Sequence, residues 1–349
     1  MKKLLFCCLM VLTTVLSSGN NIYVDCNNGN DRSSGSRDYP FRTIQRASEY
    51  VNALEGDGEV TVFLAPGLYN LDEPVLFSSK RSFTNQQRLT IRATILPDDA
   101  QWDHALMPVI MSTAPLLADK FGEVSLGLQI ETSHVTIQGM KFLGRPLHEF
   151  ISPEKIRRYY PIVRRGLSLS DLVITQCMFI ADPHVVPQHV SVLANGHSVV
   201  VDHCVFRNCK IPVVFWNAEG GTSRENAMTH CLVLGSYGCG IWTCDTGEDF
   251  VFSHNIVSGS AYCWIREKDS QKKYTVENSI FTENTRTAGY GAGPLLDFEE
   301  TPSNFLQFGE NVVTSGHIQI ETDQEARTYL HVKPDTLGSS LGAGLFKKK

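Results

Sequence analysis

The sequence predicts an all-β solenoid of the parallel β-helix type, because short β-rich runs recur along it with little helix between them. Seven of these runs align on one another, and one aligned column reads Met140, Cys177, Cys204, Cys231, Asn255, Ser279 and Asn311. Successive members of this column are 24 to 37 residues apart. A repeat of this length indicates a solenoid whose coils cannot bury their faces alone. Three short strands per repeat fit a parallel β-helix.

Two neighbouring columns indicate how each coil is built. The column two residues later is apolar throughout and reads Phe142, Phe179, Phe206, Val233, Val257, Phe281 and Val313. Aromatic and β-branched residues at a fixed position are typical of buried strands. The column one residue earlier reads Gly139, Gln176, His203, His230, His254, Asn278 and Glu310. Because Gly, Asn and His tolerate left-handed backbone, we interpret this column as a ladder of turn residues rather than a metal site.

Eight cysteines follow residue 19, and no pair of them has the CxxC spacing of a metal or redox motif. Their neighbours are mostly Val, Phe, Ile and Trp, so they are expected to be buried thiols that pack as small hydrophobes. Cys177, Cys204 and Cys231 fall in one column. We expect them to be stacked and reduced, because parallel side-chain directions oppose the torsion angle of a disulfide.

Length, charge and the first residues narrow the class of protein. The 349 residues carry a formal net charge of −6, which argues against general nucleic-acid binding because that needs a basic face. Residues 1–19 have two lysines, an apolar run and then small residues, the pattern of a secretory signal peptide. The predicted protein is therefore secreted or periplasmic, with no membrane span. Cys7 and Cys8 leave a lipid-anchored surface form as an alternative.

One helix is predicted, at 43–54 (TIQRASEYVNAL), where it would cover the open edge of the first coil. The segment 22–47, IYVDCNNGNDRSSGSRDYPFRTIQRA, resembles the opening of many secreted β-helix carbohydrate enzymes, and VTVFLAPGLYN, ending at Asn70, resembles their first coil. The chain thus resembles the pectin-lyase-like superfamily. That resemblance implies a single-stranded right-handed parallel β-helix over 20–346 that acts on a polysaccharide or oligosaccharide.

The expected ends of this domain are a closing loop at 334–346, which should cap the last coil, and a frayed tail at 347–349. A single elongated domain without a trimerisation repeat is expected to be a monomer.

Residues 241–245 (IWTCD) are echoed 22 residues later by 263–267 (CWIRE), which indicates one strand in two successive coils. Parallel neighbours lie about 4.8 Å apart. Alternation along this strand predicts that Trp242 and Trp264 stack on the outer face of a sheet, with Trp216 in the coil before. Exposed aromatic ledges suit the stacking of sugar rings, so these three tryptophans are predicted to bind substrate. The alternative is that they pack beneath a covering loop.

Asp245 and Glu267 end the two echoed strands. At one coil's spacing they would approach the roughly 5–5.5 Å separation of a retaining glycosidase pair. The arrangement resembles a β-xylosidase family on a similar β-helix, in which an acidic residue follows a Gly-Ile-Trp strand and a second lies one coil later. The chain departs from that family at the outward positions, where the echo places Cys244 and Arg266.

Elimination by a polysaccharide lyase is the other reaction predicted. It needs a base beside a uronate carboxylate and positive charge to stabilise the enolate. Arg266 and Lys268 are the candidate catalytic cations. An inserted loop at 145–165 is basic, and the further predicted substrate-binding residues are Tyr159, Arg164, Arg165 and His189.

Calcium is a possible cofactor, because it is common in lyases of the superfamily that the chain resembles. The clustered carboxylates that would hold it are Asp245, Glu248, Asp249 and Glu267. The sequence is compatible with either a lyase or a hydrolase. A β-helix that binds glycans without catalysis is the alternative to both, because such a module would keep the tryptophans without a complete acid/base pair.

Overall fold

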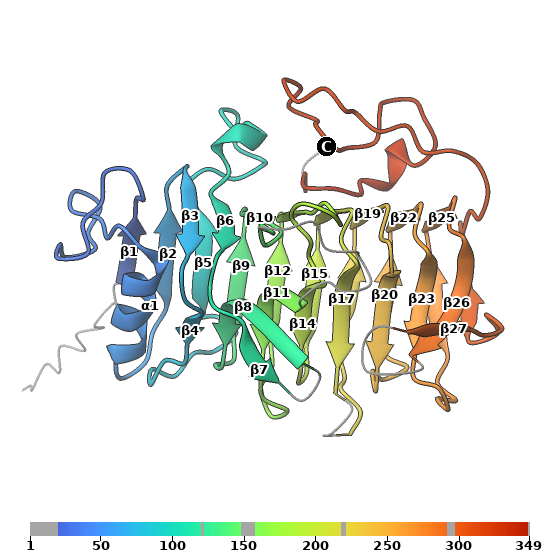
Figure 1. Ribbon diagram of the computed structural model, residues 1–349, viewed down its shortest axis with the longest axis horizontal. Coiled ribbons are helices and arrows are strands. Elements are labelled where there is room, and N and C mark those ends of the chain that lie inside the picture. The colour runs from blue at the N-terminus through green and yellow to red at the C-terminus, as the bar shows by residue number, and fades with distance from the viewer. Residues whose placement is uncertain (1–19, 120–121, 148–157, 218–220, 292–296, 348–349) are drawn as a thin grey trace, which may run out of the picture.

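A computed structural model describes residues 20–119, 122–147, 158–217, 221–291 and 297–347, and it shows one parallel β-helix (Figure 1). Each coil contributes one strand to each of three long sheets, and neighbouring strands in a sheet come from successive coils. The predicted all-β solenoid is therefore confirmed. No helix in the described part of the chain is both long enough and apolar enough to cross a membrane.

The first sheet has ten strands, all parallel. Their bounds are β1 (Asn20–Val24), β2 (Val60–Leu64), β5 (Leu89–Ala93), β9 (Val135–Gln138), β12 (Leu172–Thr175), β15 (Val199–Asp202), β18 (Ala227–Thr229), β21 (Val251–Ser253), β24 (Tyr274–Glu277) and β28 (Leu306–Phe308). The second sheet has eight. They are β3 (Leu68–Leu71), β6 (Val109–Ser112), β10 (Lys141–Leu143), β13 (Met178–Ile180), β16 (Val205–Arg207), β19 (Leu232–Leu234), β22 (Ile256–Ser258) and β25 (Ile280–Thr282).

The third sheet carries the echoed strands. Its members are β4 (Val75–Phe77), β8 (Gly122–Ile130), β11 (Arg158–Arg164), β14 (Val190–Ala194), β17 (Ile211–Trp216), β20 (Cys239–Cys244), β23 (Tyr262–Arg266), β26 (Arg286–Gly291) and β27 (Phe298–Glu300). The last of these, β27, runs antiparallel to β26, and β7 (Leu117–Asp119) likewise runs antiparallel to β8.

The predicted apolar column lines the interior of the solenoid. Phe142, Phe179 and Phe206 stack with ring centroids 4.9 and 4.8 Å apart. Cys177, Cys204 and Cys231 are buried in the same core and are free thiols, as predicted. Their Sγ atoms approach main-chain carbonyls; the distance from Cys231 Sγ to Thr229 O, for example, is 3.3 Å.

The predicted ladder of turn residues is confirmed by the backbone. His203, His230 and His254 have φ values of 48°, 51° and 57°, which lie in the left-handed region. The last coil differs from the prediction by one residue, because Asn311 rather than Glu310 takes this conformation, with φ of 56°. Asn tolerates left-handed backbone better than Glu does.

Helix α1 (Ile44–Ala53) covers the first coil, as predicted. Thr43 caps it by accepting a hydrogen bond from Arg46 N at 3.1 Å, and the helix buries Ile44, Ala47, Ser48 and Val51. The Asn52 side chain donates to Leu76 O at 2.7 Å and so satisfies a carbonyl at the edge strand β4. A covered edge cannot template the addition of another strand.

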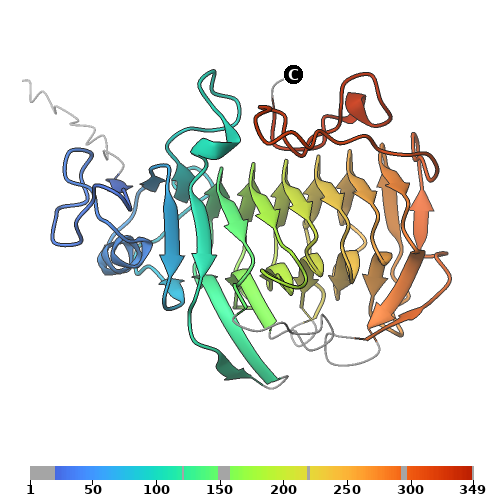
Figure 2. The ribbon, with the colours of Figure 1, turned by 45° about the horizontal axis from the view of Figure 1, so that its top comes forward.

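The C-terminal segment does not cap the last coil, which corrects the prediction for 334–346. Residues 318–347, here called the C-terminal strap, run back along the outer face of the second sheet (Figures 1 and 2). Ile318, Leu330 and Leu345 are buried against outward side chains of that sheet. These apolar residues pack on the outward-facing apolar row of the short second-sheet strands, and the contact stabilises the strap because it removes both surfaces from water. It includes the 3₁₀ helix η3 (Ser339–Leu341).

Candidate active site

The two tryptophan strands pair one residue away from the predicted register. In β20 and β23, Ile241 lies opposite Trp264 and Trp242 opposite Ile265. A shift of one residue turns a side chain to the other face of a sheet. Trp264 therefore points into the solenoid, where it is 0% exposed and its Nε1 donates to Thr243 Oγ1 at 2.9 Å. Its predicted role in substrate binding is wrong, because the indole is part of the core.

The same shift brings Glu267 to the outer face. Trp216 pairs with Cys244 across β17 and β20, and the Cys244 thiol lies within 4.8 Å of a carboxylate oxygen of Glu267 in the next coil. One outward row therefore runs Trp216, Cys244, Glu267. The outward pair is Cys244 with Glu267, not Cys244 with Arg266 as the echo suggested.

Trp242 faces outward as predicted but is only 5% exposed. Phe298 of β27 packs edge-on against it with ring centroids 5.4 Å apart, and Trp216 packs against it at 6.1 Å. The alternative of packing beneath a covering segment therefore holds for Trp242. Trp216 is half-buried and is the predicted tryptophan that offers aromatic surface beside Cys244.

An open cleft of about 620 Å³ lies at the carboxyl end of β20 and β23. Its lining residues are Asp245, Glu248, Glu267, Lys268, Asp269, Ser270, Gln271 and Lys272. Asp245 directly follows β20 in left-handed conformation, with φ of 53°, and its side chain is 37% exposed. The Lys272 ammonium lies 3.7 Å from Asp245 Oδ1. Of the two lysines in this cleft, the sequence analysis predicted Lys268 and missed Lys272. The polar run of residues 267–273 is the signal that could have indicated Lys272.

Asp245 and Glu267 lie close together in unlike surroundings. One oxygen of each carboxylate and the Cys244 Sγ atom are all within 4.8 Å of one another. The main chain links the pair directly, since Asp245 N donates to Glu267 Oε1. Burial, and secondly the charge of Asp245, raise the pKa of Glu267, whose Oε2 is buried without a hydrogen-bond partner. Two carboxyl groups with divergent environments are the usual arrangement of an acid and a base.

Arg266 does not take part in this cleft. Its Nη1 donates to Ser270 O at 2.5 Å, and its guanidinium carbon lies 4.5 Å from the ring centroid of Phe305, a residue of the solenoid core. Arg266 therefore stabilises the turn after β23. Its predicted catalytic role is wrong, because the one-residue shift in register between β20 and β23 places Arg266 away from the cleft. Lys268 does line the cleft, where its ammonium lies 5.3 Å from the ring centroid of Tyr290.

The predicted basic loop is in part a strand. Residues 158–164 form β11, three strands from β20 in the third sheet, while 148–157 lie outside the described residues. Tyr159 and Arg164 are fully buried. Arg164 donates to Asn195 O at 2.6 Å and to His197 O at 2.8 Å, and its burial lowers its pKa to about 9.

His189 is also fully buried, and burial followed by the charges of Lys210 and Arg158 holds its pKa well below its ordinary value. Neither of its ring nitrogens has a hydrogen-bond partner. The predicted binding roles of Tyr159, Arg164 and His189 are therefore wrong for a surface site. Arg165 is exposed but does not line the cleft.

The cleft fits calcium poorly. Calcium takes six to eight oxygen ligands, whereas the group within metal-binding distance here is two carboxylates and a thiol. Asp249, predicted in the calcium set, instead accepts a hydrogen bond from Glu225 N at 2.9 Å. Calcium therefore has no role in the reaction proposed for this cleft.

A second cleft, of about 470 Å³, lies at the start of first-sheet strands. Arg88 and His134 both bind the Asp171 carboxylate there, at 2.5 and 2.8 Å. Burial alone would raise the pKa of Asp171, but these two hydrogen bonds outweigh it and lower the pKa. Asp171 is therefore held as a structural anion between its partners.

No family model matches the sequence, and no curated protein matches it. Among solved structures, pectate lyase Pel9A is similar, with a TM-score of 0.51 and 11% identity over 91% of this chain and 90% of that one. A pectin methylesterase from Aspergillus niger has a TM-score of 0.49 at 11% identity, covering 93% and 95%. A GH136 lacto-N-biosidase from Eubacterium ramulus has 0.47 at 10%, covering 85% and 68%.

The likeness to Pel9A shows the fold. This chain is a parallel β-helix, the fold that it shares with Pel9A. At such low identity the activity has to be argued from the residues of the cleft.

Proposed function

We propose that the protein is a glycan-cleaving enzyme that hydrolyses a glycosidic bond in the cleft of Asp245 and Glu267, with retention of configuration. The observation that carries the proposal is the carboxylate pair, in which one oxygen of each group lies within 4.8 Å of the other and the two groups have unlike surroundings. Retaining glycosidases place their two carboxyl groups about 5–5.5 Å apart, whereas inverting enzymes need roughly 6.5–9.5 Å for a water.

Glu267 is the general acid in this proposal. Its raised pKa keeps a proton available, and it donates that proton to the glycosidic oxygen as the bond to the anomeric carbon breaks. Because Oε2 is buried in the free protein, the carboxyl group must turn toward the cleft when the substrate is bound. Asp245 is the nucleophile: its partly exposed carboxylate, beside Lys272, attacks the anomeric carbon and forms a glycosyl ester.

Water completes the reaction. Glu267, now a carboxylate, removes a proton from a water molecule that attacks the same carbon and displaces Asp245. The sugar leaves with its original configuration, and both carboxyl groups return to their starting states. Trp216, half-buried at the end of the same outward row, is the surface on which a neighbouring sugar ring stacks.

Lys268 and Lys272 favour a second candidate function. Two ammonium groups in one cleft suit an acidic glycan and would stabilise the enolate of a uronate during elimination by a lyase. The two reactions give different products. Elimination leaves an unsaturated sugar that absorbs in the ultraviolet, and hydrolysis leaves a saturated reducing end.

The test is incubation of the protein with a panel of neutral and uronate glycans. Hydrolysis predicts new reducing ends without ultraviolet absorbance, abolished in Glu267→Gln and in Asp245→Asn. The matched control is Glu248→Gln, since Glu248 lines the same cleft outside the carboxylate pair. Ultraviolet-absorbing product would favour the lyase. Binding without either product would indicate a glycan-binding module and overturn the proposal.

Secretion and the monomeric state belong to the same proposal. Residues 1–19, predicted as a signal peptide, lie outside the described residues. A polysaccharide substrate is usually met outside the cell, so we expect the mature chain in the culture medium or periplasm. Fractionation with N-terminal sequencing tests the first expectation, and gel filtration with light scattering tests the second.

A further inference from the structure

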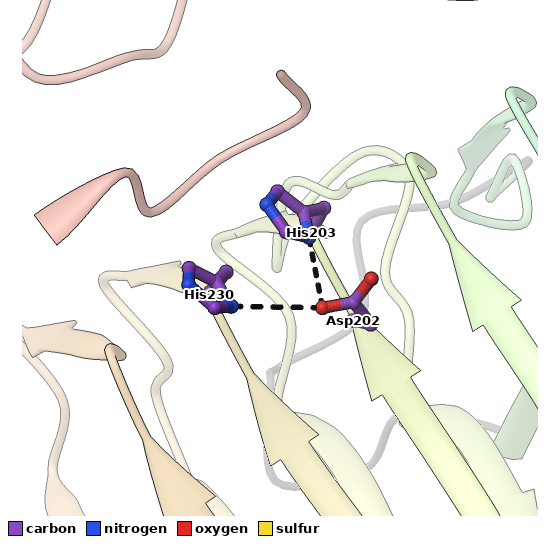
Figure 3. A group of neighbouring side chains, drawn as sticks. All are labelled: Asp202, His203 and His230. Carbon is purple, nitrogen blue, oxygen red and sulfur yellow. Dashed lines mark hydrogen bonds and ion pairs between the residues drawn. The ribbon is translucent and has the colours of Figure 1, made fainter. Parts of the chain in front are cut away.

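A cluster of possible metal ligands lies away from the cleft, at the carboxyl end of the first sheet. Asp202 ends β15, His203 follows it in the turn ladder, and His230 occupies the ladder one coil later (Figure 3). The Nδ1 atoms of His203 and His230 lie 2.8 and 3.7 Å from Asp202 Oδ1. The three ligand atoms are all within 4.8 Å of one another.

The turn ladder explains the histidines but not the aspartate. Left-handed backbone is the reason for His203, His230 and His254, whereas Asp202 ends a strand in an extended conformation. The equivalent residues of the coils before and after are Thr175 and Thr229. Asp202 is therefore a carboxylate between two threonines of its column, and it lies beside two histidines of the turn ladder. The sequence analysis considered the histidine column alone and did not predict this cluster.

The Asp202 carboxylate is held as an anion. Hydroxyl groups from the coils before and after donate to it, Thr175 Oγ1 to Oδ2 at 3.3 Å and Thr229 Oγ1 to Oδ1 at 2.9 Å. The side chains of Asp202, His203 and His230 are 18, 12 and 33% exposed. An ion from solution can therefore reach all three.

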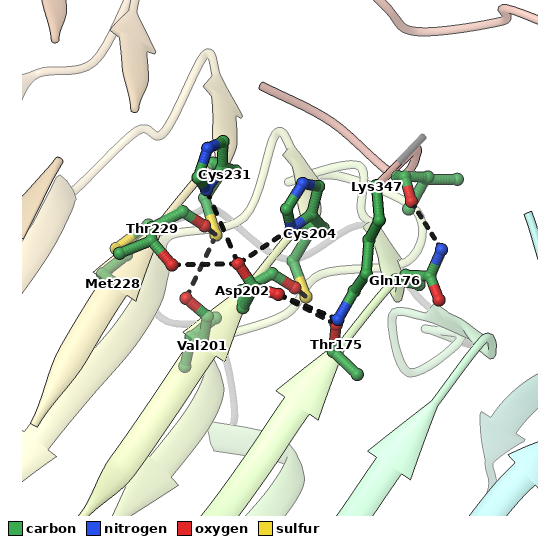
Figure 4. Close-up of polar contacts among 12 residues, drawn as sticks. Thr175, Gln176, Val201, Asp202, Cys204, Met228, Thr229, Cys231 and Lys347 are labelled. Carbon is green, nitrogen blue, oxygen red and sulfur yellow. Dashed lines mark hydrogen bonds and ion pairs between the residues drawn. The ribbon is translucent and has the colours of Figure 1, made fainter. Parts of the chain in front are cut away.

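A cation already lies on this carboxylate. The C-terminal strap places the Lys347 ammonium 3.0 Å from Asp202 Oδ2 (Figure 4). The strap is fixed up to that contact, because Gln176 Nε2 donates to Leu345 O at 2.9 Å and Lys347 N donates to Asp98 Oδ1 at 3.1 Å. The contact of Lys347 thus shows that the site attracts positive charge. The prediction of a frayed tail at 347–349 is wrong for Lys347, because these contacts hold it in place.

We propose that Asp202, His203 and His230 form a binding site for a divalent transition metal of the zinc class, with the Lys347 ammonium as the competing cation. Two imidazole nitrogens and a carboxylate oxygen are ligands that zinc prefers, at about 2.0–2.2 Å each. Two ligand atoms at that distance from a tetrahedral zinc lie roughly 3.3–3.6 Å apart. His203 Nδ1 and Asp202 Oδ1, now 2.8 Å apart in a hydrogen bond, therefore have to separate slightly, and the shared proton leaves when the metal binds.

A second movement, of His230, is also needed. The rings of His203 and His230 are stacked, 4.4 Å apart and within 9° of parallel, so their lone pairs do not yet converge. His230 has to tilt toward Asp202, and it is the most exposed ligand. The site is separate from the cleft of Asp245 and Glu267, and neither proposal depends on the other.

The test is calorimetric titration of the untagged chain with zinc chloride, with calcium chloride as the hard-cation control. We expect one zinc per chain and no comparable heat from calcium. Asp202→Asn, His203→Ala and His230→Ala should each weaken zinc binding by about tenfold or more. The matched control is His254→Ala: this ring continues the stack, 4.7 Å from His230, but lies outside the ligand group.

Lys347→Ala separates a metal site from a chance histidine contact. Removing the competing ammonium should tighten zinc binding about two- to fivefold, the range of a surface ion pair. Circular dichroism checks the fold of each variant, and the absorption of bound cobalt gives a second readout of ligand number. Absence of zinc binding by the parent, or equal affinity in the parent and in His203→Ala, would overturn the proposal.

Discussion

Asp202 and Glu267 both lie where a strand of the solenoid ends, yet their surroundings are opposite. Asp202 contacts hydrogen-bond donors from its own coil and the next, His203 and Thr229, and the ammonium of Lys347. Glu267 lies beside a thiol and a second carboxyl group, and one of its oxygens has no partner. The pKa of Asp202 is lowered and that of Glu267 is raised.

The difference shows how a solenoid tunes a carboxyl group. Stacked coils place residues of adjacent repeats about 4.8 Å away, so the coils above and below decide what surrounds the group. Donors and cations in those coils make an anion that attracts positive charge. Apolar and acidic neighbours make a weak acid that can hold a proton at a catalytic site.

The largest expected effect is on turnover. Replacing Glu267 with Gln removes the proton donor while keeping the shape of the side chain, so the rate of glycan hydrolysis should fall about 10²–10⁴-fold, the usual contribution of general acid catalysis. Steady-state measurement of released reducing ends checks this. Asp202→Asn should leave the rate within about twofold. Equal losses in both variants would mean that the two carboxyl groups do not differ as described.

The second prediction separates Trp264 from Trp216, two of the three tryptophans that the sequence predicted to bind substrate. Trp264→Ala should lower the free energy of unfolding by about 3–5 kcal/mol, because it empties a fully buried site in the core. Trp216→Ala should change stability little and weaken glycan binding by about 1–3 kcal/mol. Urea denaturation and titration calorimetry measure the two effects. A stable Trp264→Ala variant with weakened glycan binding would instead support the register predicted from the sequence, in which Trp264 faces outward.

The third prediction uses the opposite pKa shifts. The lowered pKa of Asp202 contributes stability above its unfolded value of 3.8, and that contribution is lost as pH falls through the folded value. Asp202→Asn should therefore lose about 1.5–3 kcal/mol at pH 7 and less at pH 3, since it removes charged hydrogen bonds. Urea denaturation at both pH values measures this.

Glu267 should behave in the reverse way. Its pKa is raised above 4.5, so stability is lost as pH rises from that value through the folded pKa. Glu267→Gln should therefore gain stability relative to the parent at pH 7, by about 1 kcal/mol, and not at pH 4. A gain at pH 4 that disappears at pH 7 would contradict the assigned surroundings.

The smallest expected effect concerns the C-terminal strap. Lys347 is 39% exposed, so the ion pair to Asp202 is screened by water, and Lys347→Ala should change the free energy of unfolding by less than about 1 kcal/mol. Leu345→Ala, at a fully buried position of the same strap, should cost about 2–5 kcal/mol. Comparison of the two variants shows whether the strap is held by its apolar residues.

The sequence predicted those features that repeat. Periodicity predicts the turn ladder and the column of Phe142, Phe179 and Phe206, and capping favours the helix over 43–54. Both are local properties of the sequence. The register of β20 and β23 did not follow, because two tryptophans 22 residues apart resemble a repeat while the hydrogen bonds pair residues 23 apart. The chain resolves this by burying Trp264, whose indole fills the core beside Tyr274.

Long-range contacts explain the other differences. The C-terminal strap covers an apolar row contributed by several coils, and no short stretch of sequence carries that information. Arg164 is basic yet buried, because it satisfies carbonyls of the next coil. Lys272 reaches Asp245 across a turn, and Asp202 gains its partners from two neighbouring coils and from the strap.

The central claim is that Glu267 and Asp245 cleave a glycosidic bond as an acid and a nucleophile. Nuclear magnetic resonance of the product first released from whichever glycan of the panel is cut tests it most directly. We expect retention of the anomeric configuration, with product lost in Glu267→Gln and kept in Glu248→Gln. Inversion, an unsaturated product, or full activity of Glu267→Gln would contradict it.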